Sequence, residues 1–299
     1  MNSLVSVIVI TYNSADFVVE TLESIKNQSY KNIELIVTDD SSKDNTIEIV
    51  QNWIKKNERD FQRAILITSP QNTGIPANCN RGLDQAIGEW VKIIAGDDLL
   101  LFDCIENNMR FVFQNPEVSF LFSKVQCFGS TNEINKQIEK SFNYDFFYLN
   151  VKQQYKYLVT KLNCIPAPTN FIKKTSLFKL GKYDERIKLL EDYPMWLKAT
   201  KNGYKLHFFE NDTVKYRVND NSISQSKRST SYFKNNYLIF KYYNLPSIFF
   251  YNPFLAFDLF VFFKAKSISN KLLSNTLQSL RIFSPYAYFK LFKKVLSIN

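Results

Sequence analysis

Residues 90–99 read WVKIIAGDDL, an apolar segment from Trp90 to Ala95 that runs into two adjacent carboxylates, Asp97 and Asp98. Two acidic side chains this close repel each other unless a cation or hydrogen-bond donors lie between them. Open α/β sheets bind ligands beyond the carboxyl ends of their strands. Oxygen ligands suit a hard cation, Mg²⁺ or Mn²⁺, which can bridge carboxylates to a diphosphate. The stretch therefore predicts a buried strand that ends in a site for a metal and a nucleotide diphosphate. A turn with two solvated carboxylates is the alternative.

Three earlier segments have the same character, and a helical pattern follows each. β-branched and apolar residues predict strands at 5–10, 33–38 and 64–68. Strands that alternate with helices across short polar links predict an α/β fold with a doubly wound, mostly parallel sheet flanked by helices. A polar cluster follows every strand, at 11–14, 39–42, 72–74 and 97–98. We therefore expect these clusters to lie on one edge of the sheet.

The chain from about 101 to 225 continues this pattern less regularly. It predicts a helix at about 103–114, a strand near 118–122, a partly helical insertion at 130–162, and strands near 205–209 and 213–217. The block Leu190–Trp196 opens a further helix, which Gly203 closes. Because the helix dipole favours acids at a helix start, a purely structural role for Glu191 and Asp192 is the alternative to a catalytic one.

Charge is distributed unevenly along the 299 residues. Residues 226–299 carry eleven Lys or Arg and one acid, whereas residues 1–225 carry 27 bases and 27 acids. We therefore expect a neutral domain at 1–225 and a basic, aromatic, helical tail at 226–299. Four widely spaced cysteines without a CxxC pair, and a single histidine, exclude a common zinc site and fit reduced thiols in the cytosol. Residues 1–12 predict a strand and no signal peptide.

The tail contains a long apolar segment, residues 245–263. A membrane span needs about 20 apolar residues, but Pro246, Asn252, Pro253 and Asp258 interrupt this one. An anchor that lies on the membrane fits better, with aromatic rings in the interface and bases near anionic head groups. The expected bases are Lys264, Lys266, Lys271, Arg281, Lys290, Lys293 and Lys294. A helical subdomain that packs its aromatic side chains on the body is the alternative.

Four blocks of the sequence, in order and at sensible spacing, resemble family 2 glycosyltransferases. They are VSVIVITYNSADFVVETLESIKNQSYKNIELIVTDDSSKDNT at 5–46, QNTGIPANCNRGLDQA at 71–86, the Asp97–Asp98 turn, and LGKYDERIKLLEDYPMW at 180–196. The resemblance covers roughly residues 3–224. It implies an inverting transferase of the GT-A fold that uses a nucleotide-diphospho-sugar donor. The donor half would be about 1–100 and the acceptor half about 101–225.

The resemblance also implies roles for individual residues. Asp97 and Asp98 would hold Mn²⁺ or Mg²⁺ and contact the ribose, and which of the two binds the ion is left open. The cation would neutralise charge that builds on the leaving diphosphate. Asp192 would be the general base for the acceptor hydroxyl, with Glu191 as a weaker candidate that faces the acceptor. The residues expected at the nucleotide are Thr11, Tyr12, Asn13, Asp39, Asp40, Asn80, Arg81 and Asp97, among which Asp40, beside Asp39, would hydrogen-bond the base.

Three positions depart from the family pattern. Ala95 replaces the usual first Asp of the DXD-type motif, so the metal contacts fall to the two acids that follow it. Cys79 stands where the family often has Arg, and we expect Arg81 to supply that charge. Asn219 stands where the family often has a His metal ligand, which predicts weak metal affinity or the use of Mg²⁺ as readily as Mn²⁺. The chain has no QxxRW segment, so a single addition per encounter is expected.

The resemblance and the tail together imply a polyprenyl-diphosphate-linked glycan acceptor, as in capsule or O-antigen assembly. They also imply a cytoplasmic protein that is peripheral on the inner face of the cell membrane, where residues 226–299 would meet anionic lipid.

Three other classes of function compete with this interpretation. A nucleic-acid-binding module would explain basic charge with interleaved aromatic residues, but its acidic clusters would repel phosphate, so no nucleic acid is expected as a partner. A dinucleotide-dependent oxidoreductase needs a GxGxxG turn after the first strand, where this chain has Thr11-Tyr12-Asn13-Ser14. An inactive protein of the same fold is the third, and Ala95 and Asn219 leave it open.

Overall fold

The computed structural model describes residues 3–218, 230–268, 274–276 and 279. By its internal contacts the chain divides into two compact units. The first comprises residues 1–154 and 163–219, and the second comprises residues 155–162 and 220–299. The expected boundary at 225/226 lies outside the described residues and stays a prediction.

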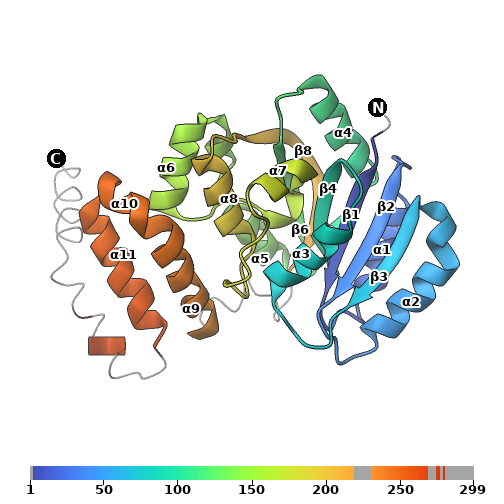
Figure 1. Ribbon diagram of the computed structural model, residues 1–299, viewed down its shortest axis with the longest axis horizontal. Helices are drawn as coiled ribbons and strands as arrows, with labels where there is room; N and C mark the ends of the chain where they lie inside the picture. Colours follow the sequence, from blue (N-terminus) through green and yellow to red (C-terminus); the bar gives the residue numbers. More distant parts are fainter. Residues whose placement is uncertain (1–2, 219–229, 269–273, 277–278, 280–299) are drawn as a thin grey trace. The chain divides into compact units, whose positions relative to one another are not determined.

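The first unit is built on a single mixed sheet (Figure 1). Its described strands are β1 (Val5–Thr11), β2 (Ile33–Asp39), β3 (Arg63–Thr68), β4 (Trp90–Ala95), β5 (Leu99–Leu100), β6 (Phe120–Phe128), β7 (Phe171–Lys173) and β8 (Leu206–Arg217). Their order across the sheet is β3-β2-β1-β4-β7-β6-β8-β5. The first four strands in this order are parallel, as are β6 and β8, whereas β7 and β5 run antiparallel to their neighbours. The predicted doubly wound, mostly parallel α/β sheet is confirmed.

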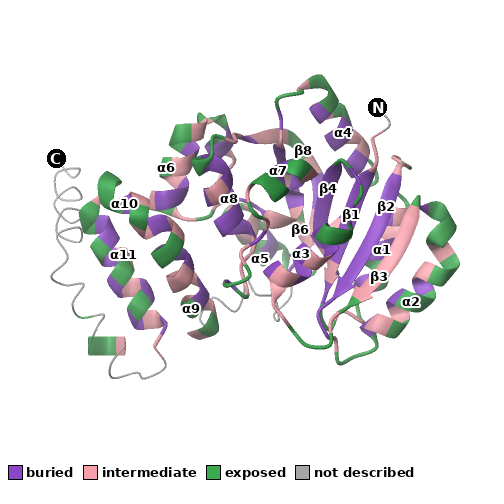
Figure 2. Cartoon of the chain, in the orientation of Figure 1, coloured by how far each residue is buried: buried purple, intermediate pink, exposed green. Residues whose placement is uncertain are grey.

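Helices cover both faces of the parallel strands. They are α1 (Val18–Lys26), α2 (Thr46–Asn57), α3 (Ile75–Gln85) and α4 (Cys104–Gln114), with a 3₁₀ turn η1 at Glu58–Asp60. Val5, Val7 and Val9 of β1 share one apolar core with α1, α2 and α4. Ile8 points the other way, where Gly82 of α3 approaches so closely that an added Cβ would lie 2.4 Å from Ile8 Cγ2. Burial on both sides explains the continuous apolar sequence of these strands, and Figure 2 shows β1, β2 and β4 buried.

The rest of the first unit follows the weaker pattern expected after residue 101. Its elements are α5 (Asn132–Glu139), η2 (Tyr144–Tyr148), the start of α6 (Val151–Lys161), η3 (Ala167–Thr169), α7 (Lys174–Lys179) and α8 (Asp192–Lys201). The insertion at 130–162 is partly helical, as predicted. Helix α8 begins at the predicted acids and ends before Gly203, whose φ of 86° closes it.

Two details of the expected strands are wrong. The strands expected at 205–209 and 213–217 form one strand, β8, which pairs with β6 through a bulge. Register moves from Ser123–Phe209 to Lys124–Asp212, so the extra residues of β8 leave the ladder locally. The strand expected near 118–122 begins at Phe120 and continues to Phe128.

The second unit is helical where it is described. Besides the end of α6 it contains α9 (Thr230–Ile239), a π-helical turn η4 (Phe240–Asn244), α10 (Leu245–Tyr251) and α11 (Pro253–Lys266). Asn244 Nδ2 donates to the carbonyl of Val159, 3.2 Å away, which holds η4 against α6. In these described segments, no helix has both the length and the apolar character that crossing a bilayer requires. Asn219 and the expected tail bases Lys271, Arg281, Lys290, Lys293 and Lys294 lie outside the described residues.

Candidate functional site

The carboxyl ends of β1 and β2 lie side by side. Thr11 pairs with Asp39 in register, and its hydroxyl donates to Asp39 Oδ2 at 2.8 Å. The backbone N–H of Ser42 donates to Asp39 Oδ1 at 2.8 Å, so this wholly buried carboxylate holds the turn after β2. Tyr12, the next residue after β1, is 48% exposed. The polar clusters after these two strands therefore share one edge, as predicted.

The loop after β1 is bound to the loop after β2. Asn13, whose φ is 52°, accepts a hydrogen bond from the N–H of Lys43 at 2.7 Å. Its own N–H donates to Ser42 Oγ at 2.8 Å. The N–H of Ala15 donates to Asp44 Oδ2 at 3.1 Å. The two loops thus form one connected rim, which we call the β1–β2 rim (residues 11–17 and 39–46).

Asp40 is the ion-pair partner of Arg81, with Nη2 and Oδ1 3.1 Å apart. The N–H groups of Thr73 and Gly74 donate to Asp40 Oδ2 at 2.9 and 2.8 Å, and Thr73 Oγ1 donates to Oδ1 at 2.6 Å. Burial alone would raise the pKa of Asp40, but the hydrogen bonds from Thr73, Gly74 and Arg81 bring it below the ordinary value. Arg81 of the second block therefore places its positive charge beside Asp40 of the first block, and Asp40 in turn holds the Thr73–Gly74 turn.

Asn80 of α3 faces the fourth expected block. Its Nδ2 donates to the carbonyl of Tyr183 at 3.0 Å and to Glu185 Oε1 at 2.8 Å. Its Oδ1 accepts from the N–H of Tyr183 at 2.9 Å. Both ends of the amide are thus engaged within the protein, and the second and fourth blocks meet here. A direct contact of Asn80 with a nucleotide stays a prediction.

The Asp97–Asp98 turn is held by the end of β8. The N–H of Arg217 donates to Asp98 Oδ1 at 2.9 Å, and Arg217 Nε donates to the carbonyl of Asp97 at 2.8 Å. The guanidinium carbon lies 4.5 Å from the ring centre of Phe17 and 4.4 Å from that of Phe128. Arg217 is therefore fixed by two aromatic rings, and it fixes the acidic pair in turn.

The electrostatics of this pair suit a cation. Burial raises the pKa of Asp98 well above its ordinary value, and the charge of Asp97 raises it further, against opposing contributions from Arg217 and Lys92. A divalent ion would offset both unfavourable effects. Within the described part of the chain, no group of three or more His, Cys, Asp or Glu side chains could hold a metal. Because Mg²⁺ commonly takes one or two carboxylates and completes its shell with phosphate oxygens and water, these residues fit an ion that binds together with a diphosphate.

Asp192 begins α8 and is 9% exposed. Asn163 Nδ2 donates to its Oδ2 at 2.7 Å. Burial raises the pKa of Asp192 above its ordinary value, although hydrogen bonds from the N–H of Tyr193 and from Asn163 oppose that rise. Burial and the charge of Asp192 raise the pKa of Glu191 to about 8. Glu191 therefore keeps its proton at neutral pH. Glu191, the N-cap residue of α8, makes no capping hydrogen bond through its side chain.

Helix α3 connects the donor side of the site with the expected base. Cys79 is wholly buried in α3, and burial raises its pKa well above the ordinary value of a thiol. The charges of Glu191, Asp192 and Asp40 raise it further, so these three acids all lie near one sulfur atom. The structure thus brings together residues that are about 150 positions apart in the sequence.

The segment 163–170 connects the base with the acidic strand. Its first residue, Asn163, holds Asp192. Near its other end, the carbonyl of Pro168 accepts from Lys92 Nζ at 2.7 Å, and Lys92 is a fully buried residue of β4, the strand that runs into the acidic pair. The segment that holds the expected base therefore also contacts β4, the strand that leads to Asp97 and Asp98.

Sequence reasoning missed two residues of this site, Asn163 and Arg217. Arg217 lies two positions before Asn219, in a block where the resemblance already suggested a metal ligand, so its position was a usable signal. Asn163 gave no such signal, because it follows a helix in the stretch with the weakest pattern.

Comparison with known proteins identifies a family. The sequence profile of glycosyl transferase family 2 matches residues 6–175. An uncharacterised glycosyltransferase of Methanocaldococcus jannaschii is 31% identical over 232 residues, which are 77% of this chain and 76% of the relative. The Escherichia coli protein WfaP is 29% identical over 229 residues, 75% of this chain and 81% of WfaP. WfaP is named as a β-1,3-glucosyltransferase acting from UDP-Glc on α-D-GlcNAc-diphosphoundecaprenol.

Solved structures share the fold. Residues 1–349 of Staphylococcus aureus TarS, in complex with UDP, match with a TM-score of 0.62 at 20% identity, over 89% of this chain and 72% of that one. A mannosyltransferase of Pyrobaculum calidifontis, in complex with GDP-Man and Mn²⁺, matches with a TM-score of 0.59 at 17% identity. The match covers 100% of this chain and 81% of the mannosyltransferase. These likenesses confirm the GT-A-type fold.

Proposed function

This chain belongs to glycosyl transferase family 2, and we propose that it moves one sugar from a nucleotide-diphospho-sugar to a hydroxyl group of a glycan. The bond between C1 and the diphosphate oxygen breaks as the acceptor oxygen bonds to C1 from the opposite side, so the anomeric centre inverts. The donor is a UDP-sugar in this proposal, which is supported by the UDP-Glc in the name of WfaP and by the UDP bound to TarS.

The environment of Asp192 carries this proposal. Its carboxylate is nearly buried, its pKa is raised, and Asn163 fixes the direction of one oxygen. A raised pKa makes an ionised carboxylate a better proton acceptor. Asp192 would therefore take the proton of the acceptor hydroxyl as attack proceeds. Glu191, which keeps its proton at neutral pH, would face the acceptor as a hydrogen-bond donor.

On the donor side, Asp97 and Asp98 would hold Mg²⁺ or Mn²⁺ together with the diphosphate. The ion would supply charge neutralisation at the leaving group. The nucleotide would lie along the carboxyl edge of β1 and β2, where Tyr12 and Asn13 are exposed. The other proposed nucleotide contacts are Thr11, Asp39, Asp40, Asn80 and Arg81, whose side chains are already hydrogen-bonded within the protein.

The acceptor in this proposal is a glycan carried on a polyprenyl diphosphate, within capsule or O-antigen synthesis. The name of WfaP, which specifies a diphosphoundecaprenol-linked sugar, supports this class of acceptor. A lipid-carried acceptor requires the transferase to work at the surface of a membrane. The protein would therefore be peripheral on the cytoplasmic face.

The substitution Asp192→Asn tests the assignment of the base. It keeps the size and most hydrogen bonds of the side chain but removes its basicity, so turnover should fall by about 10²–10⁴-fold. Binding of the donor, measured by protection against thermal unfolding, should be unchanged. Asp103→Asn is the matched control, because Asp103 is exposed at the start of α4 and should retain full activity. Equal loss of binding and turnover in Asp192→Asn would identify a structural acid instead.

A panel of donors tests the wider proposal. UDP-, dTDP- and GDP-sugars are each incubated with Mg²⁺, Mn²⁺ or EDTA, and both metal-dependent hydrolysis and thermal protection are recorded. We expect a UDP-sugar to be hydrolysed and to protect the protein against unfolding, and we expect EDTA to abolish both effects. Protection without hydrolysis or transfer, for every donor and acceptor tried, would identify an inactive protein of the same fold.

A further inference from the structure

The second unit exposes a set of aromatic side chains along α10 and α11. Their exposed fractions run from 37% for Phe260 to 86% for Phe250. We call this set the aromatic face, and its members are Phe249, Phe250, Tyr251, Phe254, Phe257 and Phe260. Six side chains of about 200 Å² each, exposed by roughly one half, amount to on the order of 600 Å². That is the upper end for the largest apolar patch of an ordinary monomer, so the face needs an explanation.

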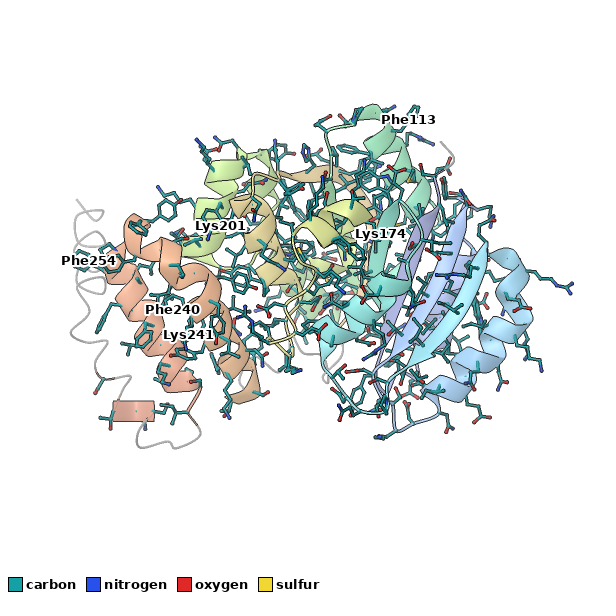
Figure 3. The ribbon with its side chains drawn as sticks, viewed as in Figure 1. Phe113, Lys174, Lys201, Phe240, Lys241 and Phe254 are labelled. Atoms are coloured by element: carbon teal, nitrogen blue, oxygen red, sulfur yellow. The ribbon has the colours of Figure 1, made fainter. Side chains whose placement is uncertain are left out.

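The spacing of these residues shows that the exposure is organised. Phe254, Phe257 and Phe260 recur every three residues and therefore lie on one side of α11. Other apolar side chains of α11 pack inside the unit, among them Leu255 and Phe263, whose ring lies 5.7 Å from that of Phe240. In Figure 3 Phe254 lies on the outside of the helices, whereas Phe240 lies among them. Helix α11 is thus apolar on two sides, and one of these faces outward.

Within the described residues 230–268, every exposed charged side chain is a lysine. Lys241 and Lys264 are exposed, and Lys266 is half-buried at the end of α11. Lys264 Nζ lies 4.9 Å from the ring centre of Tyr237, so it stays close to the helices. Asp258 is the sole acid within residues 230–268, and it is buried, 6% exposed. An apolar surface with bases around it and no exposed acid is complementary to an anionic lipid interface.

The length of the helices decides how such a surface would meet a membrane. Helices α10 and α11 have 7 and 14 residues, about 10 and 21 Å at 1.5 Å per residue. The hydrocarbon core of a bilayer is about 30 Å thick. These helices are therefore too short to cross it and suited to lie in its interface.

We propose that the aromatic face of α10 and α11 docks on an anionic lipid bilayer, with its rings in the interface and its lysines at the head groups. The biological role of this docking rests on the proposed function, because docking would bring the transferase to an acceptor that is carried on a lipid. The docking itself needs neither donor nor acceptor. It can therefore be tested separately from activity.

Vesicle flotation of the full-length protein provides the first test. Wild type should float with phosphatidylcholine vesicles that contain phosphatidylglycerol, and much less with phosphatidylcholine alone. The double variant F250S/F254S should bind at least about tenfold more weakly, because it removes two rings from the interface. F113S is the matched control, since Phe113 of α4 is 66% exposed and belongs to the first unit (Figure 3). It should bind as wild type does.

Charge-reversal variants measure the contribution of the lysines to vesicle binding separately from that of the aromatic rings. K241E/K264E should lose about tenfold or more in binding to anionic vesicles, and the loss should shrink at high salt. K201E is the control, because Lys201 is an exposed lysine at the end of α8 in the first unit. Equal loss in the control would mean that total charge, and not this face, governs binding, and would overturn the proposal.

Fluorescence reports insertion directly. The native Trp53, Trp90 and Trp196 are at most 7% exposed, so their emission should respond little to lipid. F250W should shift to shorter wavelength when anionic vesicles are added, and F113W should not. The absence of a shift in F250W would contradict docking through this face.

Two further outcomes would overturn the proposal. The first is failure of wild type to float with anionic vesicles. The second is a concentration-dependent dimer that F250S/F254S dissociates and that does not bind vesicles, because the face would then be an interface between two copies. Vesicle binding by a protein that fails every donor assay would leave the docking intact and reject the proposed reaction. Sugar transfer by a protein that does not bind vesicles would support the proposed reaction and reject the docking.

Discussion

The hydrogen bond from Asn163 to Asp192 makes a measurable prediction about the pH dependence of activity. Asn163 Nδ2 lies 2.7 Å from Asp192 Oδ2 and favours the ionised carboxylate. The substitution Asn163→Ala removes this donor and leaves the other groups around Asp192 in place. The pKa of Asp192 should rise, because the charged form loses a partner in a nearly buried site.

The size of the shift follows from the strength of that bond. A hydrogen bond to a charged group contributes about 1.5–3 kcal/mol, and one pKa unit corresponds to about 1.4 kcal/mol. Asn163→Ala should therefore raise the pKa of Asp192 by about one to two units. Because a general base must be ionised, the acid limb of kcat/KM should move to higher pH by the same amount. Above the shifted limb most of the activity should return.

The assay is the pH profile of sugar transfer with the donor identified by the panel. Asn150→Ala is the matched control, because Asn150 is also an asparagine beside α6, but its Oδ1 accepts a hydrogen bond from the N–H of Gln153 at 3.0 Å. Its profile should keep the wild-type limb even if its stability falls. A uniform loss of activity in Asn163→Ala, with the limb unmoved, would show that Asn163 only supports the fold and would refute the reasoning.

Three other substitutions test the structure around the site. Glu191→Gln should raise the unfolding temperature above that of wild type, and this gain should be larger at pH 8.5 than at pH 5. Burial and Asp192 raise the pKa of Glu191 to about 8, so the folded wild type disfavours the ionised form that the unfolded chain adopts at high pH. Equal differences at both pH values would contradict this. Asp40→Asn should lower the free energy of unfolding in urea by about 3 kcal/mol, because it leaves the Arg81 guanidinium without its carboxylate; a wild-type midpoint would show the ion pair to be dispensable. Gly82→Ala should cost about 1–3 kcal/mol, since the new Cβ would meet Ile8 Cγ2 at 2.4 Å, and adding Ile8→Ala should recover part of that loss.

The fold of the first unit could be predicted well because β1, β2 and β4 are buried on both faces. Their sequences are then nearly continuous apolar runs, and Trp90–Ala95 was located to the residue. Two strands were expected in place of β8 because Asn211 and Asp212 are typical turn residues, but a bulge places them inside one strand. These changes of register depend on the partner strand β6, about which the local sequence of β8 carries no information.

The site was predictable in its residues but not in their partners. The acids at strand ends were visible because strand ends converge on one edge of a parallel sheet. Asn163 and Asp192 are 29 residues apart, and Arg217 and Asp98 are 119 apart, so nothing local indicated either contact. The same distance hid the internal partners of Asp40 and Asn80. The assignment of residues 155–162 to the second unit is another long-range feature that a sequence pattern does not carry.

The β1–β2 rim has a consequence for the thermodynamics of binding. Asn13 and Ala15 on one loop are already tied to Lys43, Ser42 and Asp44 on the other before any ligand arrives. The freedom of these loops is therefore lost during folding, and a ligand need not order them as it binds. Removal of the hydrogen bonds between the two loops, for example by Asp44→Ala, would weaken the affinity for the donor through an unfavourable entropy of binding. The enthalpy of binding and the rate of sugar transfer would change little.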